Sequence, residues 1–279
     1  MTRDISTRMA LAVGICIVIA VSSCGAPKQA VQEARSAPAI DHGALLSQQA
    51  VDAVIWQATS AEAHRLFQQG YELARIRLDE NMKQLYGMPP AVVVDVDETV
   101  LDNSPYEVTA VAISRTYLDS SWTQWVAMRK AMPLPGSVEF LTYAAGRGCE
   151  IFYVTNRNAD HKDATVANLQ QAGFPMADNA HVFTAEGTTD KTMRRKAISM
   201  DYDIKLVIGD QLRDFDEVFK DRWDNYGRPQ VDAMQDTLRK YFVLLPNPMY
   251  GTWRDAISGN GSDAEKLEAI RNYFEKNAY

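Results

Sequence analysis

Cysteine, basic charge and long apolar runs are all scarce in this sequence, and each scarcity excludes a class of protein. The 279 residues include 3 cysteines, and 29 lysines and arginines against 36 aspartates and glutamates give a net charge of −7. Nucleic-acid polymers are bound through a basic face, so this charge balance excludes non-specific binding of that kind. After the N-terminal segment, no apolar run is long enough to cross a bilayer.

The cysteines cannot form a disulfide framework. Cys16 lies inside the N-terminal apolar segment, Cys24 ends that segment, and Cys149 is alone in the rest of the chain. One remaining cysteine excludes an internal disulfide in the main domain, whose stability must come from its core. Cys149 precedes a predicted strand and is interpreted as a small buried apolar side chain rather than a nucleophile.

The N-terminal segment has the pattern of a bacterial lipoprotein signal peptide. Arg3 and Arg8 precede or border the apolar stretch Met9–Val21, and the sequence Val-Ser-Ser-Cys that ends at Cys24 resembles a lipobox. We expect residues 1–23 to be removed and Cys24 to be lipidated. The alternative is a plain secretory signal with an incidental cysteine.

The expected location follows from the residues after that cysteine. The residues after Cys24 are Gly25 and Ala26, and neither is the aspartate associated with retention at the inner membrane. The resemblance therefore implies a lipid anchor in the bacterial outer membrane. Residues 24–45 are rich in Ala, Gln, Ser and Pro and are predicted to form a flexible tether. Residues 46–279 are then the folded domain, attached to the membrane only through the lipid.

Strand and helix patterns alternate along that domain. After a helical region from Leu46 to Leu85, apolar strands are predicted at 91–94, 151–154, 205–208 and 241–245, with helices at 136–145, 162–172 and 192–200 between them. This alternation predicts an α/β fold with a doubly wound parallel sheet. Ligands of such sheets bind at the carboxyl ends of the strands.

The first predicted strand ends in two aspartates, Asp95 and Asp97, followed by Thr99. Two carboxylates this close repel each other unless a cation or a shared proton lies between them. A solvated acidic turn is the alternative for this motif alone. We favour a divalent metal beside an aspartyl nucleophile, because other polar residues follow the later strands.

Those residues would meet the aspartates at one edge of the sheet. Taken singly, each has a simpler interpretation as a helix cap, a turn or a solvated side chain. They are Thr155 and Asn156 after the second strand, Lys191 between the second and third, and Asp210 and Asp214 after the third.

Together these groups suit phosphoryl transfer. Asp95 would attack phosphorus and form an aspartyl-phosphate, and Asp97 would protonate the leaving alcohol and then activate water. Mg²⁺ would supply most of the positive charge. Lys191 and Thr155, with Asn156 beside it, would bind the phosphate oxygens as they gain charge.

The chain resembles the haloacid dehalogenase superfamily of phosphatases and, more narrowly, the class C acid phosphatases, which include outer-membrane 5′-nucleotidase lipoproteins. The resemblance covers roughly residues 50–255. Its strings are DETVLDNSPY at 97–106, WTQWV at 122–126, PGSVEF at 135–140, FYVTNR at 152–157, GDQLRDF at 209–215 and LPNPMYG at 245–251.

The resemblance implies roles for the matching residues. Asp95 is the nucleophile and Asp97 the acid/base, and the metal is bound by the side chains of Asp95 and Asp210 and the backbone carbonyl of Asp97. Asp214 would support these ligands without binding the ion itself. The resemblance also implies the haloacid dehalogenase type of Rossmann-like sheet, with a small helical subdomain from the N- and C-terminal parts. The family often forms dimers, so a homodimer is among the expected assemblies.

The resemblance further implies that two aromatic rings hold the organic part of the substrate, a small phosphate ester of the nucleotide kind. By spacing, these rings are Tyr117 and Tyr250, with Trp125 nearby. Stacking on aromatic faces suits many bases. The alternative is that some of these rings belong to the core.

Three functions follow in order of preference. The first is a Mg²⁺-dependent phosphomonoesterase, an acid phosphatase or 5′-nucleotidase. The second is a phosphotransferase or phosphatase for non-nucleotide esters such as sugar phosphates. The third is a non-catalytic surface lipoprotein that keeps the fold, against which the complete motif set argues.

Overall fold

The computed structural model describes residues 40–84 and 86–279. The predicted signal peptide at 1–23 and the predicted lipidation of Cys24 therefore lie outside the described residues. Ile40–Tyr279 form a unit of their own. Across its described part, no helix combines the length and apolarity needed to cross a membrane.

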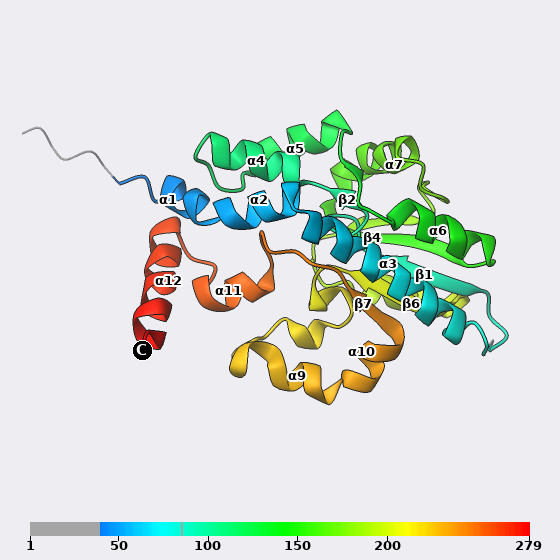
Figure 1. The fold of residues 1–279 in the computed structure, drawn as a ribbon. Helices are drawn as coiled ribbons and strands as arrows, with labels where there is room; N and C mark the ends of the chain where they lie inside the picture. The colour runs from blue at the N-terminus through cyan, green and yellow to red at the C-terminus, as the bar shows by residue number, and fades with distance from the viewer. Residues whose placement is uncertain (1–39, 85) are drawn as a thin grey trace, which may run out of the picture. The chain divides into compact units, whose positions relative to one another are not determined.

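A five-stranded parallel sheet organises this unit (Figure 1). Its order is β5-β4-β1-β6-β7, so the first strand of the sheet lies at its centre. The apolar run before Asp95 forms that strand because its side chains are buried on both faces, as parallel sheets require. The prediction of a doubly wound parallel sheet is confirmed. The strands are β1 (Pro90–Val94), β4 (Glu150–Asn158), β5 (Val182–Ala185), β6 (Asp203–Gly209) and β7 (Phe242–Leu244).

Alternate residues of the central strand enter two separate cores. Val92 and Val94 belong to the larger cluster, and Ala91 and Val93 to the smaller one on the opposite face. Helices supply the other half of each core. The larger core is covered by α3 (Ala61–Asn81), α6 (Ser137–Gly146) and α7 (Lys162–Gln171), and the smaller by α8 (Thr192–Asp201) and α10 (Gln235–Tyr241).

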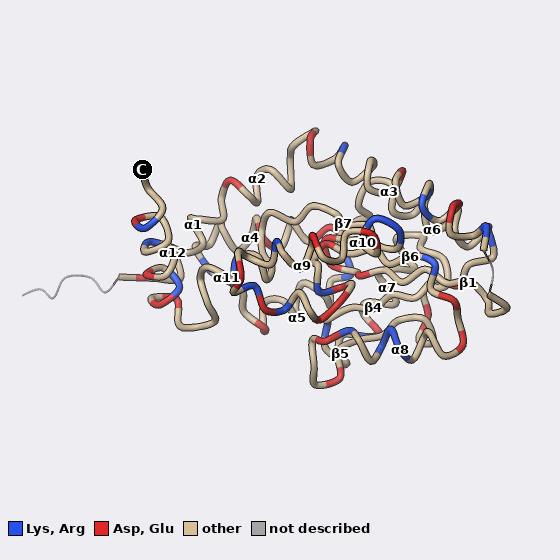
Figure 2. Tube along the Cα trace, turned by 90° about the horizontal axis from the view of Figure 1, so that it is seen from below, with Lys and Arg blue, Asp and Glu red and all other residues tan. Residues whose placement is uncertain are grey.

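The remaining helices include a helical layer from both ends of this unit, as predicted. Helix α1 packs against α12 and α2 against α4, so segments far apart in the sequence lie together (Figure 1). Figure 2 shows that basic and acidic residues both occur along α3 and α12. The bounds are α1 (His42–Gln49), α2 (Val51–Thr59), α4 (Ser104–Ala112), α5 (Asp119–Met128), α9 (Arg228–Ala233), α11 (Thr252–Ser258) and α12 (Asp263–Asn277).

Two details differ from the sequence-based expectations. The helical region expected at 46–85 is three helices, and its first helix already begins at His42, inside the expected tether. The side chain of Asp41 accepts a hydrogen bond from the backbone N–H of Ala44 (2.9 Å), which caps that helix. The edge strand β5 was not predicted, because it has four residues and only a weak apolar pattern. A two-stranded ribbon of β2 (Leu101–Asp102) and β3 (Met132–Pro133) was also not predicted.

Candidate active site

The carboxylate of Asp95 is buried at the end of the central strand. Its backbone N–H donates to the carbonyl of Ile208 (2.9 Å), which continues the pairing of β1 with β6 up to the site. The ammonium of Lys191, only 3% exposed, makes an ion pair with Asp95 and a second with Asp214 (2.7 Å). The predicted nucleophile and the predicted lysine therefore lie together.

Asp210 completes an acidic cluster with Asp95 and Asp214. Each of these residues offers one carboxylate oxygen, and these oxygens lie within 4.8 Å of one another. The orientation of Asp210 is fixed by the side-chain amides of Asn247 (2.7 Å) and Gln211 (2.9 Å), which both donate to its Oδ2. Neither amide was given a role in the sequence analysis.

The cluster is short of positive charge. Burial raises the pKa of the Asp95 carboxyl to about 7; Lys191 opposes the shift, whereas Asp214 and Asp97 add to it. Burial, followed by the charges of Asp214 and Asp95, raises the pKa of Asp210 well above its usual range. Clustered carboxylates with one ammonium are a donor set that suits a hard divalent cation. The residues present therefore fit a divalent metal ion.

Gly209, the last residue of β6, leaves the space that Asp214 occupies. A Cβ at Gly209 would lie 2.6 Å from the Cβ of Asp214, closer than any side chain allows. Asp214 in turn accepts a hydrogen bond from the backbone N–H of Gln211 (2.9 Å), which closes the turn after β6. The string GDQLRD is thus a compact turn in which the glycine makes room for the aspartate that pairs with Lys191.

Asp97 lies beside Asp95, and its carboxylate is held by other groups. Arg157 donates to it through Nε (3.0 Å to Oδ1) and Nη2 (2.7 Å). The side-chain amide of Asn103 donates from the other side (2.8 Å), and the hydroxyl of Thr155 lies 3.4 Å from Oδ2. The carboxylate of Asp97 is thus held outside the acidic cluster, and its role in proton transfer stays a prediction.

Arg157 is itself fixed in place. It is 3% exposed, its Nη1 donates to the hydroxyl of Thr165 (3.1 Å), and its guanidinium lies 5.5 Å from the ring centre of Trp122. Sequence analysis quoted Arg157 only within a family string. Its spacing of two residues from Thr155 on the same strand was the available signal, because alternate strand residues share a face.

Near the carboxyl end of β4, Thr155 is fully buried and Asn156 is exposed. Arg194 of α8 joins them, donating to the carbonyl of Thr155 (2.6 Å) and to the side-chain oxygen of Asn156 (2.8 Å). The hydroxyl of Thr155 also accepts the backbone N–H of Arg157 (3.1 Å). The backbone that follows the strand is therefore held at the rim beside Asp97.

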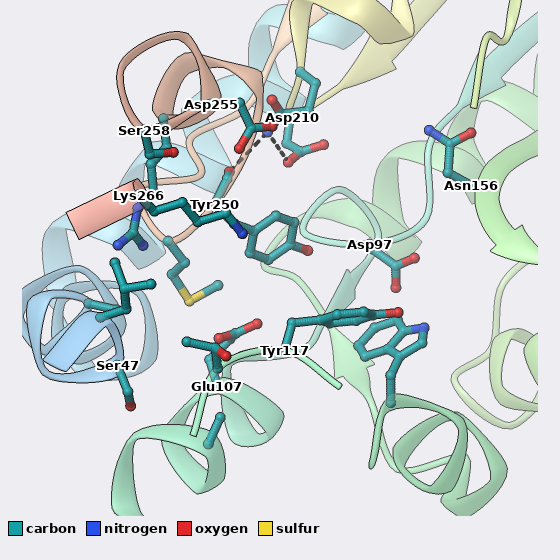
Figure 3. A pocket seen from close by; sticks show the side chains of 18 of the residues that line it. Ser47, Asp97, Glu107, Tyr117, Asn156, Asp210, Tyr250, Asp255, Ser258 and Lys266 are labelled. Carbon is teal, nitrogen blue, oxygen red and sulfur yellow. Dashed lines mark hydrogen bonds between the residues drawn. The ribbon is translucent and has the colours of Figure 1, made fainter. Parts of the chain in front are cut away.

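These residues open into a cavity of about 560 Å³. Its walls include Asp95, Asp97, Lys191 and both predicted tyrosines. Figure 3 shows Tyr117 and Tyr250 between Asp97 on one side and the far end of the pocket on the other. A small phosphate ester would therefore place its phosphate at the carboxylates and its organic group between the rings.

The two tryptophans of the string WTQWV differ in position. Trp122 lines the cavity, and its ring lies edge-on to Tyr106 (5.2 Å between centres). Trp125 is not among the residues that line the cavity; its indole N–H donates to Asn103 (2.8 Å), which holds Asp97. Trp125 thus contacts the residue that holds Asp97 and does not line the cavity, so the structure does not support the predicted contact of Trp125 with the substrate.

The comparisons with known proteins agree with this geometry. The family model described as HAD superfamily, subfamily IIIB (acid phosphatase) matches residues 18–253. Acid phosphatase 1 of Solanum lycopersicum is 28% identical over 165 residues, and the stem 31 kDa glycoprotein of Glycine max is 26% identical over 164 residues. Each alignment covers 57% of this chain, which spans 57% and 58% of those relatives.

Solved structures extend the similarity over the fold. The class C acid phosphatase of Bacillus anthracis with tungstate bound is 34% identical, with a TM-score of 0.77, and the match covers 81% of this chain and 97% of that one. A second structure of that enzyme gives the same identity and coverage and a TM-score of 0.74. The chain therefore belongs to the HAD superfamily, subfamily IIIB, the acid phosphatases, a family of phosphoric monoester hydrolases.

Proposed function

We propose that this protein is a Mg²⁺-dependent phosphomonoesterase that acts on nucleotides or similar small esters through an aspartyl-phosphate. The observation that carries the proposal is the buried pairing of Asp95 with Lys191 inside the acidic cluster, at the inner end of a pocket lined by Tyr117 and Tyr250. A nucleophile, a cationic partner and a place for the organic group are thereby combined.

Asp95, Asp210 and the backbone carbonyl of Asp97 are the residues that would hold the ion, with Asp214 supporting the site through Lys191. When bound, the ion neutralises charge on the carboxylates and on the phosphoryl oxygens. Lys191 adds a second positive charge at the same place, and the hydroxyl of Thr155 adds a hydrogen-bond donor. These groups lower the repulsion between an anionic nucleophile and an anionic ester.

The chain's own residues then divide the reaction into two displacements. A carboxylate oxygen of Asp95 forms a bond to phosphorus while the bond to the leaving oxygen breaks, and Asp97 gives that oxygen a proton. Water then attacks phosphorus, Asp97 takes its proton, and the bond from phosphorus to Asp95 breaks. Inorganic phosphate and the alcohol are the products.

Asp95→Asn tests this mechanism. We expect phosphate release from a nucleotide, a sugar phosphate and an aryl phosphate to fall about 1,000-fold or more, because the amide is a poor nucleophile. Chelation of divalent metal should abolish turnover in the wild type, and added Mg²⁺ should restore it. Asp236→Asn, at a fully exposed carboxylate, is the matched control.

The outcomes separate the rival functions. Activity of Asp95→Asn equal to that of the wild type would contradict the mechanism, and a wild type without activity on any ester would favour the non-catalytic lipoprotein. Tyr250→Ala should impair nucleotide turnover far more than aryl phosphate turnover, because a nucleotide has more ring surface to stack. Equal losses would favour a broad phosphatase or phosphotransferase.

A further inference from the structure

The cavity continues beyond the two tyrosines into a charged far end. Figure 3 shows Glu107, Ser47, Ser258 and Lys266 gathered on the side of the tyrosines away from Asp97 and Asn156. This wall is built by helices α1, α4, α11 and α12. A phosphate group and one aromatic ring would not reach this wall. We therefore ask which part of a substrate it could contact.

Part of this far end lies beyond the segment that the family model matches. The family model ends at residue 253, whereas Arg254, Asp255, Ser258 and Lys266 line the cavity after it. The catalytic end is therefore built from family motifs, whereas the far end combines α1 and α4, inside the matched segment, with α11 and α12, which lie mostly or wholly after it. Residues that distinguish one substrate from another within a shared chemistry are expected in such a segment.

The far end carries both signs of charge. Its acidic residues balance its basic ones, so a second phosphate group is not the favoured ligand. Within the described residues, neither the carboxylate of Glu107 nor the guanidinium of Arg254 has a hydrogen-bond or ion-pair partner. Partly buried polar groups of this kind are most stable when a ligand supplies the missing partners. The charged lining residues are Glu107, Asp255 and Asp263 on one side and Arg115, Arg254 and Lys266 on the other.

Glu107 and Arg254 lie near enough to influence each other. Burial raises the pKa of Glu107 to about 7, and the charge of Arg254 opposes that shift. They belong to different helices, α4 and α11, and both line the same cavity. An acceptor and a donor thus line the same cavity beyond the tyrosines.

We propose, on the basis of the phosphatase function above, that Glu107 and Arg254 form a specificity subsite for the amide-type edge of a nucleobase. Such an edge has a ring N–H next to a carbonyl, as in the 6-oxopurines guanine and hypoxanthine. Glu107 accepts from the N–H and Arg254 donates to the carbonyl oxygen. Adenine presents a bare ring nitrogen in place of the N–H, which would face the carboxylate of Glu107 unfavourably.

Steady-state turnover of GMP, AMP and p-nitrophenyl phosphate at about pH 8, where Glu107 is ionised and can only accept, tests the subsite. We expect kcat/KM of the wild type to be about tenfold higher for GMP than for AMP, as for a hydrogen-bonded substrate edge in a half-exposed site. Glu107→Gln has nearly the same shape, and its amide can pair with either base, so this ratio should fall to about one. Arg254→Met should lower GMP turnover about tenfold. Hydrolysis of p-nitrophenyl phosphate, which has no such edge, should stay within about twofold of the wild type.

Glu268→Gln, at an exposed position of α12 outside the cavity, is the matched control. It should change neither the GMP to AMP ratio nor the hydrolysis of p-nitrophenyl phosphate. Calorimetric titration with guanosine and adenosine measures the same preference without the reaction. A GMP to AMP ratio that Glu107→Gln leaves unchanged, or equal binding of the two nucleosides, would overturn the subsite. Failure of the catalytic proposal looks different, because Asp95→Asn would then hydrolyse p-nitrophenyl phosphate as fast as the wild type.

Discussion

At the scale of single residues, Asp97 shows how a motif residue depends on partners outside its motif. The sequence supplies its carboxylate, but Arg157, Asn103 and Thr155 determine its direction. Those partners come from the segment after β2 and from β4. In the proposed role of acid/base residue, Asp97 needs this restraint, because misplacement by a fraction of an ångström slows proton transfer.

Arg157→Lys tests that restraint. An ammonium is a single point of contact and cannot reproduce the two parallel hydrogen bonds of the guanidinium. We expect kcat for p-nitrophenyl phosphate to fall about 100-fold while KM changes little, because the substrate phosphate is still bound at Lys191. An increase in KM with unchanged kcat would assign Arg157 to substrate binding instead. Arg271→Lys, at an exposed position of α12, is the control.

At the scale of elements, the strongest predictions came from the buried strands. The run before Asp95 is apolar at every position, as expected for a central parallel strand, and the apolar runs of β4 and β6 identified its two neighbours in the same way. The edge strand β7 was predicted from the apolar run at 241–245. The edge strand β5 has solvent on one side and little apolar pattern, so local sequence did not identify it. The turn after β6 depends on an element-level contact, the close approach of Gly209 to Asp214.

Gly209→Ala tests that contact. The added methyl group would displace Asp214 and with it the ion pair to Lys191. We expect activity to fall at least about tenfold and the free energy of unfolding to fall by about 2 kcal/mol, as for overpacking of a buried site. Chemical denaturation and p-nitrophenyl phosphate hydrolysis measure the two effects.

Gly146→Ala provides the comparison for this prediction. No atom lies within 4 Å of a Cβ built at Gly146, and alanine favours helix over glycine, so stability should rise slightly or stay unchanged. If Gly209→Ala behaves like Gly146→Ala, the close approach has no functional importance.

At the scale of the whole molecule, the folded unit has its own core and its own site. Among the residues that the structure describes, Ile40–Tyr279 supply both apolar clusters and the lining of the cavity. A protein that begins at Ile40 should therefore unfold at the same temperature as one that begins at Cys24, and should hydrolyse p-nitrophenyl phosphate at the same rate. Scanning calorimetry and steady-state kinetics check this. A clear loss of stability in the shorter protein would show that residues before 40 contribute to the fold.

The sequence by itself determined the fold class and led to a prediction of the catalytic residues, several of which line one cavity in the structure. Buried parallel strands need continuous apolar runs, and paired aspartates at a strand end repel each other unless a cation or a shared proton lies between them. Both features are visible in local sequence. The tertiary structure decided which side chains restrain them. Arg157, Asn247 and Gly209 act through contacts between distant elements, and no local pattern encodes those contacts. The same holds for the far end of the pocket, where helices from both ends of the folded unit meet and Glu107 and Arg254 line one cavity.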